Sequence, residues 1–223
     1  MFKRTLQSGV LIAIDGIDGA GKTTQTTILK DYYTEIGFNV STFKEPTNGF
    51  YGRRTKELAA NGRHVITPEE ELELFINDRI EDCKFNIIPA LEAKNIVVVD
   101  RYYFSTIAYQ GALGLDIDKI IELNENIAVI PNLVFILNIP VKEAMRRIVK
   151  IRNDKVNYFE KAPYLSKVDA IFKRMRAPHL HHIDGMKSID DVFLSIKEII
   201  DRYIDQLSIN GKIECGKIEI LQN

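Results

Sequence analysis

A glycine-rich segment near the N-terminus constrains this chain more than any other feature. Residues 16–23 read Gly16-Ile17-Asp18-Gly19-Ala20-Gly21-Lys22-Thr23, a complete G-x-x-x-x-G-K-T phosphate loop. The loop follows an apolar run at 10–14, typical of a buried strand, and opens a helix-like stretch from Thr23 to Gly37. In that context the loop amides and the helix N-terminus point at a phosphate. We expect Lys22 to reach the β- and γ-phosphates and the Thr23 hydroxyl to hold Mg²⁺.

The alternative for this segment is a plain glycine turn, which the lysine, the threonine and both flanks disfavour. The dinucleotide fingerprint G-x-G-x-x-G is absent, because these glycines are spaced G-x-x-G-x-G. The sequence therefore favours phosphate binding over a nicotinamide cofactor.

Short apolar runs alternate with helix-like stretches along the chain. The strand-like runs cover 10–14, 39–43, 96–99, 133–137 and about 181–183. Short apolar strands alternating with helices are typical of a parallel sheet covered on both faces. We expect an α/β fold with a doubly wound, five-stranded parallel sheet and a ligand at the carboxyl ends of its strands.

Helix boundaries are marked at two places. Thr67-Pro68-Glu69-Glu70 is a capping box, and it predicts a helix to about residue 93 with a kink or interruption at Pro89. Ser188 predicts the start of an amphipathic helix that ends near Leu207. Residues 1–207 therefore form one predicted domain. The tail 208–223 alternates weakly, which leaves an edge hairpin or disorder open.

The net charge, the cysteines, the apolar runs and the histidines of the chain limit the classes of partner and site that we expect. The net charge of −1 gives no global attraction to nucleic acid or to an anionic membrane. Cys83 and Cys215 form no metal-like spacing, which favours a reducing, intracellular setting. No run approaches the length of a membrane span, and the N-terminal apolar run is too short for a signal peptide. Three histidines at 179, 181 and 182 lack the companions of a recognisable metal site.

Two further groups are candidates for chemistry. Asp100 and Arg101 end a buried strand, where a carboxylate can orient Mg²⁺ and an arginine can grip a phosphate; the alternative is a structural ion pair. Phe75 and Arg79 share one helical face and could stack and bond a base. The alternative, favoured from spacing alone, makes Phe75 a core residue and pairs Arg79 with a carboxylate of its own helix, such as Asp82.

Basic residues gather in two further segments. Arg146, Arg147, Lys150, Arg152 and Lys155 lead into the polar stretch 153–163, so that a mobile lid near 150–163 is one interpretation and an ordinary basic helix surface is the other. After Lys44-Glu45-Pro46, a loop is followed by further basic side chains. That loop is either a ligand contact or a solvated turn.

Several stretches together carry a resemblance to a known family. They are Asp15 to Gln25, Glu45-Pro46, Leu74 to Arg79, Asp100-Arg101-Tyr102 continuing through Ser105 to Ala108-Tyr109-Gln110-Gly111, Pro131-Asn132-Leu133, and Phe159-Glu160-Lys161. From about residue 9 to residue 207 the chain resembles the thymidylate kinases, among the phosphate-loop nucleoside monophosphate kinases. The resemblance implies transfer of the ATP γ-phosphoryl group to dTMP with Mg²⁺, in a cytoplasmic homodimer. Kinases for another nucleotide or a deoxynucleoside, and a nucleotide-bound switch protein, remain alternatives, although the guanine-reading Asn-Lys-x-Asp of GTPase switches is absent.

The resemblance also implies roles for individual residues. Lys22 and Thr23 serve ATP and Mg²⁺, Asp100 assists near the metal, and Asp18 contacts the sugar and phosphate region of the acceptor. Phe75 stacks on thymine, Arg79 and Gln110 bond its edge, and Tyr109 crowds the 2′ position. The implied ATP-binding residues are Gly16, Ile17, Asp18, Gly19, Ala20, Gly21, Lys22, Thr23 and Thr24. The implied dTMP-binding residues are Asp18, Glu45, Phe75, Arg79, Arg101, Ser105, Tyr109 and Gln110.

The family pattern leaves the catalytic arginine to the lid. Some relatives carry an arginine inside the phosphate loop, at the position of Gly19 here, so the resemblance makes Arg152 the leading catalytic candidate and Arg147 the next, beside Lys22, Arg101 and Asp18. Two positions depart from the pattern: Lys44 and Lys56 stand where many relatives have arginine. Lysine lacks the bidentate fork, which leaves their contact with the acceptor phosphate open. Arg53 or Arg54 could substitute.

Overall fold

Five parallel strands form the central sheet of the computed structural model, which describes residues 4–61, 66–152, 158–210 and 217–221, the side chains of 59–61, 151, 152, 158–161, 209 and 210 excepted. The strand order is β2-β3-β1-β4-β6. Their bounds are β1 Val10–Asp15, β2 Val40–Lys44, β3 Ile96–Asp100, β4 Leu133–Asn138 and β6 Leu180–Asp184. In the centre, Ile12 lies opposite Val98 on one side and Leu133 on the other. The predicted parallel five-stranded sheet is confirmed.

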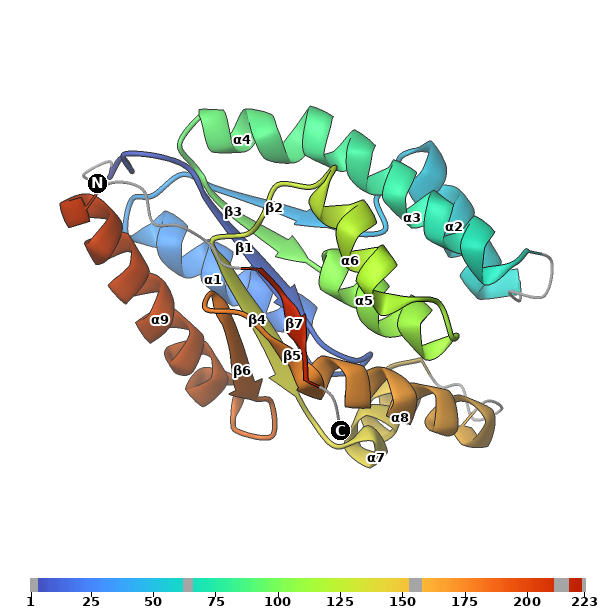
Figure 1. The fold of residues 1–223 in the computed structure, drawn as a ribbon. Helices are drawn as coiled ribbons and strands as arrows, with labels where there is room; N and C mark the ends of the chain where they lie inside the picture. The colour runs from blue at the N-terminus through green and yellow to red at the C-terminus, as the bar shows by residue number, and fades with distance from the viewer. Residues whose placement is uncertain (1–3, 62–65, 153–157, 211–216, 222–223) are drawn as a thin grey trace.

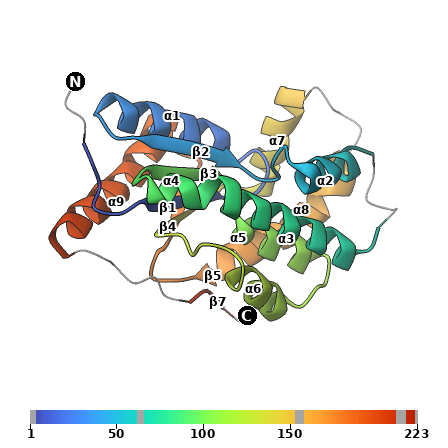
Figure 2. The same ribbon diagram turned by 90° about the horizontal axis from the view of Figure 1, so that it is seen from above.

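Helices cover both faces of this sheet (Figures 1 and 2). α1 (Lys22–Glu35) and α9 (Ile189–Asn210) pack together on one face. The opposite face carries α3 (Pro68–Asp82), α4 (Ile88–Glu92), α5 (Tyr103–Ala112) and α8 (Tyr158–Arg174), with α6 (Ile117–Glu125) beside α5. α2 (Phe50–Asn61) and α7 (Val141–Arg152) lie at the end toward which the strands point (Figure 1). The strands β1 and β3 are buried throughout, as their composition predicts.

The capping box at Thr67 forms as the sequence predicts. The Thr67 side chain accepts from the Glu70 N–H, and the Glu70 carboxylate accepts from the Thr67 N–H. The predicted interruption near Pro89 appears as a π-helical segment, η2 (Cys83–Ile87), in which the Ile88 N–H bonds the Cys83 carbonyl. Pro89 then lies in the first turn of α4, where its missing N–H is tolerated.

The described part of the tail joins the fold. α9 continues to Asn210, past the predicted end at 207. β7 (Glu219–Ile220) then pairs antiparallel with β5 (Met175–Arg176), the short strand that directly follows α8. Ile218 is buried in the core. The tail therefore pairs with a distant part of the chain instead of folding back on itself. Within the described residues, no helix combines the length and apolarity needed to span a membrane.

Candidate active site

The phosphate loop connects β1 to α1 at the carboxyl edge of the sheet. Gly16, Gly19 and Gly21 adopt positive φ angles of 132°, 81° and 101°, which favour glycine. A side chain at Gly16 would also collide with the Leu137 carbonyl oxygen, 2.6 Å from the added carbon. Gly21 is the N-cap of α1, and no side chain caps that helix end. The amides of the first turn are thereby left for an anion.

Lys22 is buried inside this loop. Its Nζ donates to the carbonyl oxygens of Gly16 at 3.0 Å and Ile17 at 2.8 Å. Burial and the positive charge of Arg101 together lower the pKa of Lys22 to about 7, although the neighbouring carboxylates oppose the shift. A phosphate bound beside the buried ammonium group would supply a neighbouring negative charge. It would therefore favour the protonated form of Lys22.

Thr23 and Asp100 lie together, as the metal prediction requires. The Thr23 hydroxyl donates to Asp100 Oδ2, while Lys44 Nζ lies 3.0 Å from the same carboxylate oxygen and 3.1 Å from Thr23 Oγ1. Asp100 Oδ1 is buried and has no hydrogen-bond partner among the described residues. A hydroxyl and a carboxylate are hard oxygen ligands of the kind that Mg²⁺ prefers, so this pair fits the cation.

Arg101 turns out of the strand end into the site. Its φ of 73° is a left-handed conformation that costs energy for a residue other than glycine. The guanidinium pairs with Asp18 Oδ1, donates to Ser105 Oγ at 3.0 Å and lies 5.4 Å above the ring of Tyr109. The Tyr109 hydroxyl in turn accepts from the Asp18 N–H at 3.2 Å. Four predicted acceptor residues therefore form one connected group.

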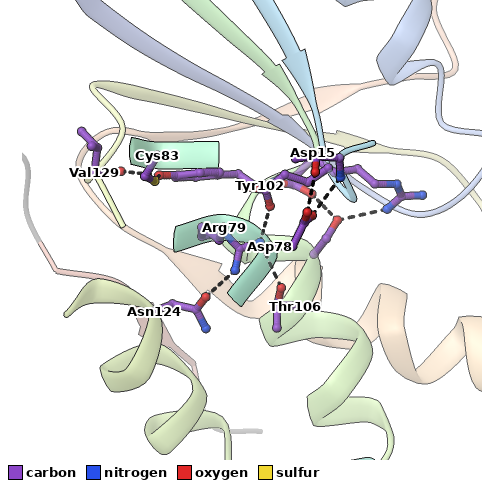
Figure 3. Close-up of polar contacts among 12 residues, drawn as sticks. Asp15, Asp78, Arg79, Cys83, Tyr102, Thr106, Asn124 and Val129 are labelled. Atoms are coloured by element: carbon purple, nitrogen blue, oxygen red, sulfur yellow. Dashed lines mark hydrogen bonds and ion pairs between the residues drawn. The ribbon is translucent and has the colours of Figure 1, made fainter. Parts of the chain in front are cut away.

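Asp15 supports that group, although sequence analysis did not single out this residue as a candidate for the site. Its carboxylate accepts from the Ser105 hydroxyl and from the Tyr102 N–H, the latter at 2.9 Å (Figure 3). Burial raises the pKa of Asp15 to about 6, although these hydrogen bonds and Arg101 oppose that shift. Asp15 thus fixes the turn that carries Arg101 and Ser105.

Arg79 is the centre of a buried polar cluster between α3, α5 and α6. Its guanidinium pairs with Glu45 and donates to Asn124 Oδ1 and, at 3.2 Å, to Thr106 Oγ1 (Figure 3). It pairs with Glu45 and not with Asp82 of its own helix, so that the alternative derived from helix spacing is wrong. Burial raises the pKa of Glu45 to about 8, while the Arg79 charge opposes this shift. Arg79 Nε and Glu45 Oε1 keep no hydrogen-bond partner among the described residues.

Phe75 lies on the same face of α3 as Arg79. The ring is only half-buried, and Phe75 does not belong to the apolar core formed by the described residues. The alternative that Phe75 is a core residue is therefore wrong. One turn earlier, the Glu71 carboxylate accepts from Gln110 Nε2 at 2.9 Å. Two of the predicted base contacts, Arg79 and Gln110, are thus bonded by residues that sequence analysis did not single out: Thr106 and Asn124 for Arg79, and Glu71 for Gln110.

The comparison with known families agrees with this arrangement. The family model described as thymidylate kinase matches residues 14–196. The chain belongs to the thymidylate kinase family. It is 43% identical over 196 residues to the thymidylate kinase of Desulfotalea psychrophila, covering 86% of this chain and 96% of that protein. It is 39% identical over 196 residues to the probable thymidylate kinase of Archaeoglobus fulgidus, covering 88% and 97%.

A solved thymidylate kinase has a similar fold. The crystal structure of thymidylate kinase from Ehrlichia chaffeensis matches with a TM-score of 0.64 and 30% identity. The match covers 86% of this chain and 98% of that one. Most of the chain therefore has the fold of a thymidylate kinase.

The lysines that depart from the thymidylate kinase pattern have partners of their own. Lys44 pairs with Asp100, as described above. Lys56 Nζ donates to Asn48 Oδ1 at 2.7 Å, in the loop after Pro46, and Arg54 lies 3.5 Å from Glu57. The same loop is fixed to α3, because the Thr47 N–H donates to Asp78 at 2.8 Å.

The basic helix α7 reaches the phosphate loop through Arg147. Its guanidinium donates to the Gly185 carbonyl at 3.2 Å and approaches the Gly19 carbonyl at 3.5 Å, while Glu143 holds it at 2.7 Å. Arg146 pairs with Glu143 on the exposed side. The side chain of Arg152 and residues 153–157 of the predicted lid lie outside the described residues. Among the residues that the structure describes, no group of three or more histidine, cysteine, aspartate or glutamate side chains is placed to hold a metal ion.

Proposed function

We propose that this chain transfers the γ-phosphoryl group of ATP to the 5′-phosphate of dTMP, giving dTDP and ADP. The observation that carries the proposal is the meeting of two groups at one edge of the sheet. The phosphate loop around Lys22 lies beside the Arg101–Asp18 pair, and Arg101 lies over Tyr109. A donor triphosphate and an acceptor phosphate would be bound on either side of that junction.

The donor side would bind the nucleotide and the metal. The loop amides and Lys22 would bind the β- and γ-phosphates, while Thr23 and Asp100 would hold Mg²⁺. The cation would neutralise charge on the phosphates. The residues themselves position the reactants, because phosphoryl transfer needs little covalent chemistry from the protein.

The acceptor side would recognise dTMP by its charge and by its base. Arg101 would exchange its partner Asp18 for the acceptor phosphate, which is the stronger bidentate ligand. Phe75 would stack on thymine, and Arg79, held by Glu45, would donate to the base carbonyl. Arg152 would close from the lid over the γ-phosphate, with Arg147 as the second candidate.

A phosphoryl-transfer assay with ATP over a panel of nucleoside monophosphates and nucleosides tests this proposal. We expect dTMP to be the preferred acceptor and dTDP the product. A preference for another monophosphate would favour a different nucleotide kinase, and a preference for an unphosphorylated nucleoside would favour a deoxynucleoside kinase. Binding of ATP without transfer to any acceptor would favour a switch protein.

The variant Lys22→Ala tests the phosphate-loop part of this proposal. We expect it to abolish transfer while the thermal unfolding curve keeps its shape, because Lys22 bonds only loop carbonyls in the described structure. Lys30→Ala, at an exposed position of the same helix α1, is the control and should leave turnover unchanged. Near-normal turnover in Lys22→Ala would contradict the phosphate-loop assignment.

We also propose a cytoplasmic homodimer. Exposed apolar side chains gather on α3 to α4 and on the segment after α5, namely Ile80, Phe85, Ile88, Leu123 and Ile130. Such residues are costly to leave in water and favour a partner surface. Sedimentation of the protein should give a dimer, and Ile80→Glu combined with Ile88→Glu should give a monomer. The buried free thiol of Cys83 supports a reducing compartment.

A further inference from the structure

We propose that Glu71 determines the base selectivity of the acceptor pocket by fixing the orientation of the Gln110 side-chain amide. The inference rests on the proposed function, because it concerns the pocket that would hold the thymine of dTMP. It makes Glu71 a positioning residue: Glu71 would act on the base only through Gln110.

The first step is the way in which α3 and α5 face each other. Arg79 bonds Thr106, and Glu71, two turns earlier on α3, bonds Gln110, one turn later on α5. The two helices therefore run in opposite directions along this contact. Phe75 lies midway between Glu71 and Arg79 on the same face of α3. A base stacked on Phe75 would have Arg79 toward one end and Gln110 toward the other.

The second step is the polarity of the Gln110 amide. A carboxylate offers only acceptor oxygens, so the atom of Gln110 that lies 2.9 Å from Glu71 Oε2 must be the amide nitrogen. Turning the amide over would place two acceptor oxygens against each other in a buried site, where an unmade hydrogen bond is costly. Gln110 is 1% exposed, so water does not compensate such a reversal.

The third step is what this orientation leaves over. Gln110 Oε1 is buried and has no hydrogen-bond partner among the described residues. The same is true of Arg79 Nε on the other side of Phe75. On either side of Phe75 there is therefore a buried atom available to a base: an acceptor, Gln110 Oε1, and a donor, Arg79 Nε. Groups of this kind are normally bonded in folded proteins, which indicates that a ligand completes them.

These two atoms match one pyrimidine edge and mismatch the other. Thymine offers a donor, N3–H, and an acceptor, O4, which pair with Gln110 Oε1 and Arg79 Nε. Cytosine offers an acceptor at N3 and a donor at N4, so each contact would place like groups together. A site whose buried polar groups are left unpaired by the wrong substrate rejects that substrate strongly. The selectivity holds only while Gln110 cannot turn over.

Glu71→Gln tests this role, because it keeps the size of the side chain and replaces the pure acceptor by an amide. Gln110 then has a hydrogen-bond partner in either orientation and can present Nε2 to the base. We expect the ratio of kcat/KM for dTMP to kcat/KM for dCMP to fall at least about tenfold, with kcat for dTMP changing less than the ratio. Glu73→Gln, at an exposed position of α3, is the matched control and should keep the wild-type ratio.

Glu71→Met provides a second variant should the buried amide prevent folding. Methionine has a similar length, forms helices well and leaves no acceptor, so Gln110 is again free to turn and the ratio should fall as in Glu71→Gln. Thermal unfolding separates this effect from simple loss of structure, because a merely structural role would lower the activities with dTMP and dCMP together.

The outcomes are distinguishable from those of the proposed function. A wild-type protein that phosphorylates neither nucleotide would contradict the proposed function itself. A wild-type protein that prefers dTMP, together with folded Glu71 variants that keep its dTMP-to-dCMP ratio, would overturn the role of Glu71 and leave the proposed function standing.

Discussion

At the scale of a single residue, a substitution at Phe75 can distinguish base stacking from core packing. Its ring is half-buried and lies outside the core of the described residues. We therefore expect Phe75→Ala to weaken dTMP binding by about 1–3 kcal/mol, the range for losing one base–aromatic stack, and to leave ATP binding unchanged. Isothermal titration calorimetry with each ligand measures both effects. Leu194→Ala, which removes an exposed apolar side chain from α9 on the other face of the sheet, is the control. Equal losses for dTMP and ATP would contradict stacking.

Tyr109 is held in place by contacts to its hydroxyl and to its ring. Its hydroxyl accepts from the Asp18 N–H, and its ring packs edge-on against Tyr164 and Phe172, at centroid distances of 6.2 Å and 6.4 Å. A ring fixed in this way cannot move aside for a 2′-hydroxyl. We expect kcat/KM for dTMP to exceed that for ribothymidine monophosphate, and Tyr109→Ala to narrow the difference. Equal values in the wild-type protein would remove this role.

Local sequence predicts the residues of the site better than it predicts their pairs. Asp100 and Arg101 stand at the end of β3, and Thr23 follows the neighbouring strand β1 through the phosphate loop, so the strand order brings them together. Glu45–Arg79 and Glu71–Gln110 join different elements, and their contact depends on how α3 is rotated against α5. Helix periodicity predicts which residues of α3 share a face, but it does not predict which other element each face contacts. For that reason the spacing argument selected Asp82 for Arg79, and Glu71 was missed.

At the scale of elements, the packing of α7 limits where an arginine for the transferred phosphoryl group could lie. α7 packs on the phosphate loop: a side chain at Gly19 would lie 2.7 Å from the Ala144 carbonyl oxygen, and the φ of 81° there adds strain. An arginine at position 19 is therefore not tolerated without rearrangement. Under the proposed function, we expect the arginine that serves the transferred phosphoryl group to come from α7 or from the segment that follows it.

We expect Arg152→Ala to lower kcat by a factor on the order of 10²–10³, the scale for removing one preorganised charge-stabilising donor. Arg147→Ala should have the smaller effect on the chemical step, because Glu143 and the Gly185 carbonyl already hold that guanidinium. Single-turnover kinetics on both variants and on the double variant compare them directly. A normal chemical step in all three would exclude an arginine from this region.

The elements that can be predicted from the sequence are those marked by a local pattern of residues. The strands and the Thr67 capping box follow from apolar runs and cap chemistry, and both form as expected. The π-helical turn before Pro89 and the pairing of β5 with β7 do not follow from local pattern. β7 pairs with residues more than 40 positions earlier, and a two-residue strand carries no periodicity.

At the scale of the whole molecule, residues 217–221, the described part of the tail beyond α9, belong to the folded structure. Ile218 is 7% exposed and lies next to β7, which pairs with β5, the strand after α8. We expect Ile218→Ala to lower the free energy of unfolding by about 2–4 kcal/mol, the usual cost of truncating a buried isoleucine. Urea unfolding measures it. Leu221→Ala, at a side chain 47% exposed, should cost far less. Equal stability of the two variants would show that the tail does not contribute to the core.

The stability of the whole molecule should also depend on His179. This side chain is 6% exposed, and neither ring nitrogen has a hydrogen-bond partner among the described residues. Burial lowers the pKa of His179 from 6.5 to about 4, and His181 lowers it further. Between these two pH values the unfolded chain binds the proton and the folded chain does not, so this residue destabilises the fold as the pH falls from 6.5 toward 4.

Other buried groups shift in the opposite direction, because burial raises the pKa of Asp15 and of Asp82 to about 6. The contribution of His179 is therefore measured as a difference between two proteins. His179→Leu removes the titrating ring and keeps an apolar side chain, so we expect it to gain stability relative to the wild type as the pH falls from 6.5 to 4. Above pH 7.5 the difference should be constant, since both states of the wild type then hold a neutral imidazole. Urea unfolding of both proteins at half-unit pH steps gives the two curves. A difference that stays constant down to pH 4 would mean that the buried imidazole titrates alike in the folded and unfolded chains.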